Sequence, residues 1–289
     1  MVDVTDETHV PTGPDEIRRL VELASDLARE AGLLVHDGRP ARVDVHSTKS
    51  SPQDVVTAMD LASEDLLRRR LTQRRPHDGV LGEEEGFRAG TSGVTWVVDP
   101  IDGTVNYLYG LPAYAVSVAA VTAPDPALEP TPENWTVLAG AVFAPWDGRL
   151  FASGRGIGAT LDGRPIRVNP ARPLVDSLLG TGFGYLAERR RAQAAVVAAL
   201  LPQVRDIRRI GSAALDLCTL ASGGLDLYYE RGLAPWDLAA AALIAQEAGA
   251  LVTGLRGAPA GRAMTVAGPP GSFESLRSLL EDLDADGGA

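Results

Sequence analysis

One stretch decides how this sequence is interpreted: VVDPIDGTVNYLYG, residues 97–110. Its two valines end a short apolar run that is typical of a buried strand, and we expect that strand to stop at Pro100. Asp99 and Asp102 then stand three residues apart, followed at once by a glycine and a threonine. Two carboxylates a few ångströms apart raise each other's pKa, so both stay ionised only where a cation compensates.

Two interpretations of this motif are open from its residues alone. Proline followed by Asp-Gly is a strong turn signal, so the segment is on one view a plain turn. On the other view it is a cation site, because a strand that ends in a tight turn brings both carboxylates to one side. Oxygen ligands without a neighbouring histidine or cysteine favour Mg²⁺ over zinc.

Three other acidic segments are ambiguous in the same way. GEEEG at 82–86 reads as an acidic surface loop, but it follows the strand-like GVL, which places Glu83 at a strand end. Asp237, in PWD before an alanine-rich run, is what a helix N-cap looks like. Asp54 and Asp60, in SPQDVVTAMD, also fit cap and turn positions.

Composition limits the class of protein. The chain has 289 residues, of which 45% are hydrophobic and 22% charged, so a sizeable core is expected. A net charge of −11 argues against a nucleic-acid-binding surface. Cys218 is the only cysteine, which excludes an internal disulfide and fits a reducing cytoplasm. No apolar run approaches the roughly 18 residues that cross a membrane, and the polar, acidic start does not resemble a signal peptide.

Helix and strand patterns interleave along the chain, which predicts a layered α/β protein. The expected helices lie at 15–32, within 54–71, and at 191–204, 211–224, 235–250 and 272–283. The expected strands lie at 94–100, 114–123, 137–146, 177–184, 225–230, 250–255 and 263–268.

A glycine-rich stretch around 153–170 suggests a boundary between two subdomains. We expect a first α+β subdomain at 15–155 with the metal site and a second, α/β, at 156–282 with the substrate pocket. Frayed tails are expected at 1–14 and 283–289.

Taken together, three segments resemble one family. GEE at 82–84, WVVDPIDGTVNY at 96–107 and the run from RRIGSAALD to QEAGA at 208–250 occur in the set and order of the inositol monophosphatases. That family comprises Mg²⁺-dependent, lithium-sensitive sugar phosphatases, and the resemblance extends from about Asp15 to the last helix. It implies an αβαβα sandwich, a homodimer and hydrolysis of phosphate monoesters by a water molecule that attacks phosphorus in line.

The resemblance also implies a ligand set for two to three Mg²⁺ ions. Glu83, Asp99 and the backbone carbonyl of Ile101 would hold one ion. Asp99, Asp102 and Asp237 would hold a second. A third, weaker ion would lie near Glu83 through water.

Catalytic roles follow from the same resemblance. Thr104 and Asp60 would orient and activate the attacking water, and Asp54 would support that corner of the site. Lys49, the only lysine among the 27 basic residues, falls where the family also has a lysine in a metal-site loop. Its expected role is electrostatic support and not metal ligation.

The resemblance implies substrate contacts at six positions. The backbone amides of Gly103 and Thr104 would meet the phosphate. Glu230 and Ala213 match positions that contact sugar hydroxyls, and Asp237 would lie beside them. Asp216 lies one helical turn after Ala213, and its match is looser.

The substrate itself stays open. The segment after Gly103 resembles the bacterial inositol monophosphatases, which favours inositol 1-phosphate, and residues 180–185 are expected to line the sugar pocket. Histidinol phosphate, 3′-phosphoadenosine phosphate and fructose 1,6-bisphosphate are the alternatives. So is a regulatory binding protein that keeps the fold. We expect a phosphorylated small molecule as the partner, and neither nucleic acid nor a membrane.

Overall fold

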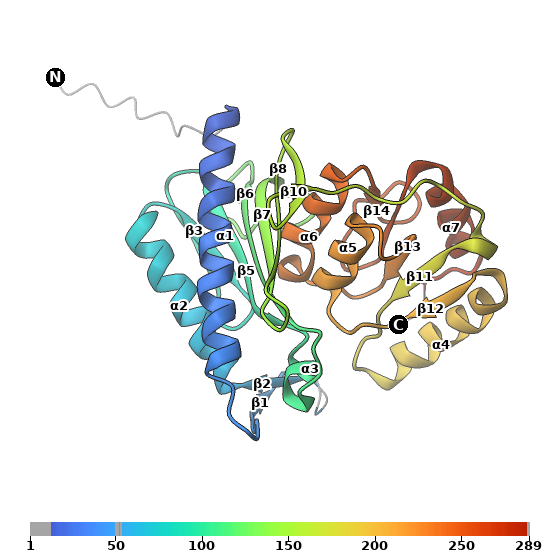
Figure 1. Cartoon of the computed structure of the whole chain (residues 1–289), viewed down its shortest axis with the longest axis horizontal. Coiled ribbons are helices and arrows are strands. Elements are labelled where there is room, and N and C mark those ends of the chain that lie inside the picture. Colours follow the sequence, from blue (N-terminus) through green and yellow to red (C-terminus); the bar gives the residue numbers. More distant parts are fainter. Residues whose placement is uncertain (1–12, 50–51, 53, 288–289) are drawn as a thin grey trace.

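The structure is a computed structural model that describes residues 13–49, 52 and 54–287 (Figure 1). Residues 1–12 of the expected N-terminal tail lie outside the described part, as do Ser50, Ser51 and Gln53 in the loop after Lys49. None of the helices in the described ranges is both long enough and apolar enough to cross a membrane.

Helices and strands alternate as the sequence predicts. The helices are α1 (Pro14–Asp37), α2 (Ala58–Arg74), α3 (Thr104–Tyr109), α4 (Ala187–Leu200), α5 (Ala213–Ala221), α6 (Pro235–Glu247) and α7 (Pro270–Asp282), with short 3-10 turns at Leu174–Asp176 and Leu201–Gln203. The strands are β1 (Val45–Thr48), β2 (Val55–Thr57), β3 (Gly79–Gly82), β4 (Gly86–Arg88), β5 (Val94–Asp102), β6 (Ala115–Thr122), β7 (Thr136–Ala144), β8 (Arg149–Gly154), β9 (Gly158–Leu161), β10 (Arg164–Pro165), β11 (Leu178–Thr181), β12 (Asp206–Arg208), β13 (Leu227–Glu230), β14 (Leu251–Thr253) and β15 (Thr265–Gly268).

The larger sheet has eight strands in the order β10-β9-β8-β7-β6-β5-β3-β4, and only β3 and β5 pair in parallel. Successive side chains of a strand point to opposite faces of the sheet, and both faces of this sheet are apolar and covered by helices. Trp96 and Val98 pack in one core with α1 and α2. Val97, between them, packs in the other core with α5 and α6.

The smaller sheet has five strands in the order β12-β11-β13-β15-β14. Tyr228 of β13 packs in the core that holds α5 and α6. Leu227 and Tyr229 point to the opposite face, where they join a third core with α4 and α7. The layers therefore run helix, sheet, helix, sheet, helix, from α1 and α2 to α4 and α7 (Figure 1). This confirms the predicted αβαβα architecture.

The strand that carries the first motif is longer than expected. β5 does not stop at Pro100 but continues to Asp102, and its pairing with β6 is irregular between Asp99 and Asp102. Proline is tolerated in a strand where such an irregularity interrupts the ladder. The prediction of a strand end at Pro100 was therefore wrong by two residues. Both aspartates lie within β5, one on each side of the irregular pairing.

Two predicted boundaries also differ from the structure. β9 and β10 follow residue 155 yet extend the larger sheet, since each pairs antiparallel with the strand before it. The helix expected at 191–204 instead spans Ala187–Leu200, and Pro202, which lacks a backbone N–H, follows its end.

The C-terminal segment, as far as the structure describes it, is packed against the rest of the protein. Ala285 is buried, and the Arg231 guanidinium donates to the Gly287 carbonyl at 2.9 Å. Arg256 pairs with the carboxylates of Asp284 and Asp286. A frayed tail over 283–287 was therefore the wrong expectation, because three side-chain contacts and an apolar side chain hold the segment.

Candidate active site

Nearly all the predicted site residues meet at one cavity of about 380 Å³. It lies where the ends of β3 and β5 meet the N-terminal ends of α3, α5 and α6. Among the predicted residues, the cavity is lined by Lys49, Asp54, Glu83, Asp99, Ile101, Asp102, Gly103, Thr104, Ala213, Glu230 and Asp237. Asp60 and Asp216 do not line it.

Three carboxylates converge at the centre of this cavity. Oxygens of Asp99, Asp102 and Asp237 all lie within 4.8 Å of one another. Asp99 accepts a hydrogen bond from the Ile101 amide at 3.0 Å, and Asp237 accepts one from the Ala234 amide at 2.8 Å. Asp237 is thus not the N-cap of α6 that the sequence suggested: Ala234 holds that position, and Asp237, in the first turn, accepts its amide and also faces the other two aspartates.

The electrostatics of this trio fit a cation. Burial, together with the neighbouring carboxylates, raises the pKa of Asp99 and of Asp237 well above the ordinary value. Burial also raises the pKa of Asp102. Within the described residues, none of the three forms a salt bridge with a basic side chain. Three carboxylates, two of them buried and that of Asp237 half-buried, that offer only oxygen ligands and form no salt bridge in the described part of the chain suit a hard divalent cation such as Mg²⁺.

Glu83 lies beside the trio because β3 and β5 run in parallel. Gly82 pairs with Val98, so the next residues of the two strands, Glu83 and Asp99, lie at the same end of the paired segment. The Lys49 ammonium contacts Glu83 at 2.7 Å and Glu84 at 2.6 Å. Burial lowers the Lys49 pKa, but these two carboxylates outweigh burial and hold it above its usual value.

Thr104 connects Asp60 to the cavity. Its hydroxyl lies 3.0 Å from Asp60 Oδ1 and 2.9 Å from the Ile101 carbonyl oxygen. Asp60 is fully buried and also accepts from the amide and hydroxyl of Thr57, at 2.8 and 2.5 Å, so it caps α2. Burial raises the Asp60 pKa to about 6. Asp60 therefore reaches the cavity only through Thr104.

The turn after β5 depends on a glycine. Gly103 has a φ of +96°, in the left-handed region, and a Cβ there would lie 2.8 Å from the Ala113 carbonyl oxygen. Any other residue would be strained there and would collide with backbone. This turn starts α3, and Gly103 and Thr104 both line the cavity.

Glu230 and Asp216 differ in their access to the cavity. Glu230 lines the cavity and accepts a hydrogen bond from the Tyr228 hydroxyl at 2.6 Å, and burial raises its pKa to about 7. Asp216 is only 1% exposed, and its carboxylate makes no hydrogen bond of good geometry in the described part of the chain. Burial raises the Asp216 pKa to about 9. A direct contact between Asp216 and a substrate does not fit this position.

Several cavity residues carried no sequence signal. Arg189, Arg209, Arg231 and Arg262 line the cavity, but arginine makes up all but one of the basic residues and so does not stand out. Tyr185 also lines it, within the 180–185 segment expected at the sugar pocket.

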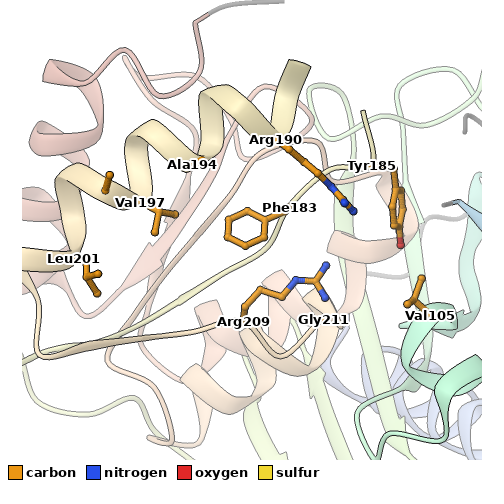
Figure 2. Close-up of a pocket in the computed structure, with 10 residues that line it drawn as sticks. Val105, Phe183, Tyr185, Arg190, Ala194, Val197, Leu201, Arg209 and Gly211 are labelled. Carbon is orange, nitrogen blue, oxygen red and sulfur yellow. The ribbon is translucent and has the colours of Figure 1, made fainter. Parts of the chain in front are cut away.

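A second cavity, of about 660 Å³, adjoins the first (Figure 2). The two cavities share Phe183, Tyr185, Arg209 and Gly211. The Phe183 ring projects between α4 and Arg209, whose guanidinium lies 6.0 Å from the ring centre (Figure 2). The Arg190 guanidinium lies 5.9 Å from the centre of the Tyr185 ring. The second cavity is thus mostly apolar, with two cation–aromatic pairs among its lining residues.

Comparison with known proteins gives one consistent family. The profile of the inositol monophosphatase family matches residues 16–282. The inositol-1-monophosphatase of Mycobacterium leprae is 44% identical over 93% of this chain and 94% of its own length. The Nus factor SuhB of Xylella fastidiosa is 40% identical over 84% of each chain.

Solved structures agree with the sequence comparison. SuhB of Mycobacterium tuberculosis superimposes with a TM-score of 0.76 and 42% identity, over 93% of this chain and 98% of its own. The suhB protein of Bartonella henselae has a TM-score of 0.82 and 30% identity, over 91% and 98%. Inositol monophosphatase II of Staphylococcus aureus with bound inositol monophosphate has a TM-score of 0.74 and 26% identity, over 93% and 97%.

Proposed function

This chain belongs to the inositol monophosphatase family, and we propose that it is a Mg²⁺-dependent phosphatase whose main substrate is inositol 1-phosphate. One observation carries the proposal most directly: the carboxylate trio Asp99, Asp102 and Asp237 lines the same cavity as Thr104. The trio suits divalent cations, and Thr104 with Asp60 offers a path for the proton of a nucleophilic water. Hydrolysis of a phosphate monoester needs both parts.

The proposed ligands are those that the sequence resemblance implied. Glu83, Asp99 and the Ile101 carbonyl would hold one ion, and Asp99, Asp102 and Asp237 a second. A third, weaker ion would lie near Glu83. Bound Mg²⁺ supplies a Lewis acid for the phosphoryl oxygens and lowers the pKa of a coordinated water.

The role of Thr104 follows from its hydrogen bonds. Its hydroxyl has one proton and two acceptors in reach, Asp60 Oδ1 and the Ile101 carbonyl. With that carbonyl bound to a cation, the proton would go to Asp60, and the hydroxyl oxygen would accept a hydrogen bond from the attacking water. Above a pH of about 6 the Asp60 carboxylate is ionised and draws that proton through Thr104. Asp54 would support this corner, and Lys49 would keep Glu83 ionised by its charge.

The opposite end of the cavity would hold the alcohol that leaves. As water oxygen bonds to phosphorus, the ester bond to the alcohol oxygen breaks, and that oxygen takes up a proton. The Gly103 and Thr104 amides would bind the phosphate. The Glu230 carboxylate and the Ala213 backbone would bind hydroxyls of the ring, with Asp237 beside them.

Phosphate release from inositol 1-phosphate tests the proposal. We expect release with Mg²⁺, loss of release with a chelator, and inhibition by millimolar Li⁺. Asp99→Asn should reduce kcat at least about a hundredfold, because it removes a ligand shared by both ions. Asp65→Asn, on the exposed face of α2, is the control. Activity that survives both chelation and Asp99→Asn would refute the mechanism.

A second candidate substrate class is favoured by the adjoining cavity. One of the solved Staphylococcus aureus relatives has 2′AMP bound. Phe183 and Tyr185 at the junction of the two cavities offer aromatic surfaces on which a base could stack. If nucleotides are the true substrates, kcat/KM for 2′-AMP exceeds that for inositol 1-phosphate and Phe183→Ala reverses the order. Histidinol phosphate, 3′-phosphoadenosine phosphate and fructose 1,6-bisphosphate complete the panel.

A regulatory binding role is the alternative of a different class. It is favoured by the relative named Nus factor SuhB. The phosphate-release assay distinguishes this role from catalysis. We further propose a cytoplasmic homodimer, which fits the single buried cysteine and the family. Sedimentation equilibrium of the purified protein tests the dimer.

A further inference from the structure

Helix α2 turns a polar face toward the candidate active site. Asp60, Ser63 and Glu64 lie at positions i, i+3 and i+4, so they share one face, and all three are fully buried. Asp60 contacts Thr104, as described above. The Ser63 hydroxyl donates to the Pro100 carbonyl at 3.1 Å, in the segment between the two motif aspartates.

Glu64 contacts the other metal-site segment. One carboxylate oxygen accepts the Glu84 amide at 2.8 Å, and the other accepts the Glu85 amide at 3.0 Å. Arg68, one turn later on α2, donates to Glu64 at 2.8 Å and to the Gly86 carbonyl at 2.6 Å. This Glu64–Arg68 pair therefore makes three hydrogen bonds to the backbone of the turn at 84–86.

The turn that the pair holds is the one that presents Glu83. On the strand side, Gly82 is fixed by its pairing with Val98. On the other side, the Glu84 amide is fixed by Glu64. A Cβ on Gly82 would lie 2.2 Å from the Glu64 carboxylate, so any other residue there would displace that carboxylate. Glu83 is thus held from both of its neighbours.

A buried charged pair is weak evidence for stability, because desolvation offsets the attraction. The position of this pair, against the backbone of a predicted ligand, indicates another purpose. We propose that Glu64 and Arg68 are positioning residues that hold the Glu83 carboxylate beside Asp99 in the geometry that binds a divalent cation. This inference rests on the proposed metal-dependent function.

Direct binding of Mg²⁺ to chelator-treated protein tests the proposal without any activity assay. Glu64→Gln keeps the size but replaces one acceptor oxygen with an NH₂ group, which leaves a turn amide unpaired. We expect its Mg²⁺ dissociation constant, measured by calorimetry well below the unfolding temperature, to rise about tenfold, as for partners of metal ligands in other proteins. Turnover should recover at saturating Mg²⁺.

Asp65→Asn is the matched control. Asp65 pairs with Arg69 at 3.2 Å on the same helix and at the same i, i+4 spacing, but both side chains are exposed. Its Mg²⁺ affinity should stay within twofold of that of the unaltered protein. Arg68→Gln is the second variant, for use if Glu64→Gln does not fold. It loses the bond to Gly86 and should weaken Mg²⁺ binding at least about threefold.

The outcomes separate this inference from the proposed function. If the unaltered chain binds Mg²⁺ and both variants bind it equally well, the positioning role is refuted and the metal site stands. A lower unfolding temperature with unchanged affinity has the same meaning, since it shows a purely structural pair. If the unaltered chain binds no Mg²⁺, both the inference and the proposed function fail.

Discussion

The Ser212 hydroxyl donates a hydrogen bond to the Asp102 carboxylate at 2.5 Å, which joins the end of β5 to the start of α5. The same hydroxyl accepts from the Leu215 amide at 3.2 Å and so caps α5. The Ala214 amide adds a second bond to Asp102 at 2.7 Å. Asp102 is thus held at a helix N-terminus, where the free amides and the helix dipole favour a negative charge.

Replacing Ser212 with alanine should affect both stability and metal binding. Loss of the cap and of a bond to a charged group should cost about 2 kcal/mol of the free energy of unfolding. Mg²⁺ affinity, measured by calorimetry, should fall about tenfold because Asp102 is no longer oriented. Ser222→Ala is the control, since Ser222 follows the other end of α5 and its hydroxyl lies within hydrogen-bond distance of the Cys218 and Thr219 carbonyls, in its own helix. Equal Mg²⁺ affinity in Ser212→Ala and the control would contradict this account.

The metal-free protein should lose stability as the pH rises. The pKa values of Asp99, Asp102 and Asp237 are raised in the folded state above the ordinary value of 3.8, so the folded state holds protons that the unfolded state releases. Stability therefore falls as the pH rises above about 4. Mg²⁺ competes with those protons, so the stabilisation that it gives should grow with pH. Thermal unfolding from about pH 5 to 8, with chelator and with Mg²⁺, measures both trends. A chelator curve that rises over this range would contradict the prediction.

Asp216→Asn should stabilise the protein at high pH without loss of activity. With a folded-state pKa of about 9 against the ordinary 3.8, Asp216 favours the folded state less and less as the pH rises between these values. Asparagine does not ionise, so the gain in unfolding temperature should be larger at pH 8 than at pH 5. We expect kcat/KM to stay within about threefold. A loss of tenfold or more in kcat/KM would instead restore Asp216 as a substrate contact.

Binding of a polyol phosphate should weaken below neutral pH because of Glu230. Its pKa of about 7 means that it loses its charge, and part of its capacity to accept hydrogen bonds, as the pH falls through neutrality. KM for inositol 1-phosphate should therefore rise from pH 8 to pH 6, and Glu230→Gln should flatten this dependence. Tyr228→Phe removes the hydrogen bond that lowers the Glu230 pKa, so the inflection should move to higher pH. An unchanged KM profile in Glu230→Gln would argue against this role.

The sequence predicted the parts of the site that local geometry fixes. Asp99, Asp102, Gly103 and Thr104 are so close in the chain that one strand and one turn bring them together in almost any fold. The layered architecture followed from alternating apolar strands and amphipathic helices. The predicted end of β5 and the predicted subdomain boundary differed from the structure. β5 extends beyond Pro100 because an irregular pairing accommodates proline, and β9 and β10 belong to the larger sheet.

The sequence by itself thus determined a layered α/β protein and the carboxylates of the β5 turn. Through family resemblance it also indicated the αβαβα order of the layers and the other residues of the site. Only the tertiary structure decided which side chains support that turn. Glu64, Arg68 and Ser212 match common helix-surface and cap patterns, and nothing local shows that they face Glu83 or Asp102. The tertiary structure also shows that Asp216 does not line the cavity. Contacts such as that of Asp102 with Ser212 depend on how separate layers pack, and no periodicity in a single segment encodes that packing.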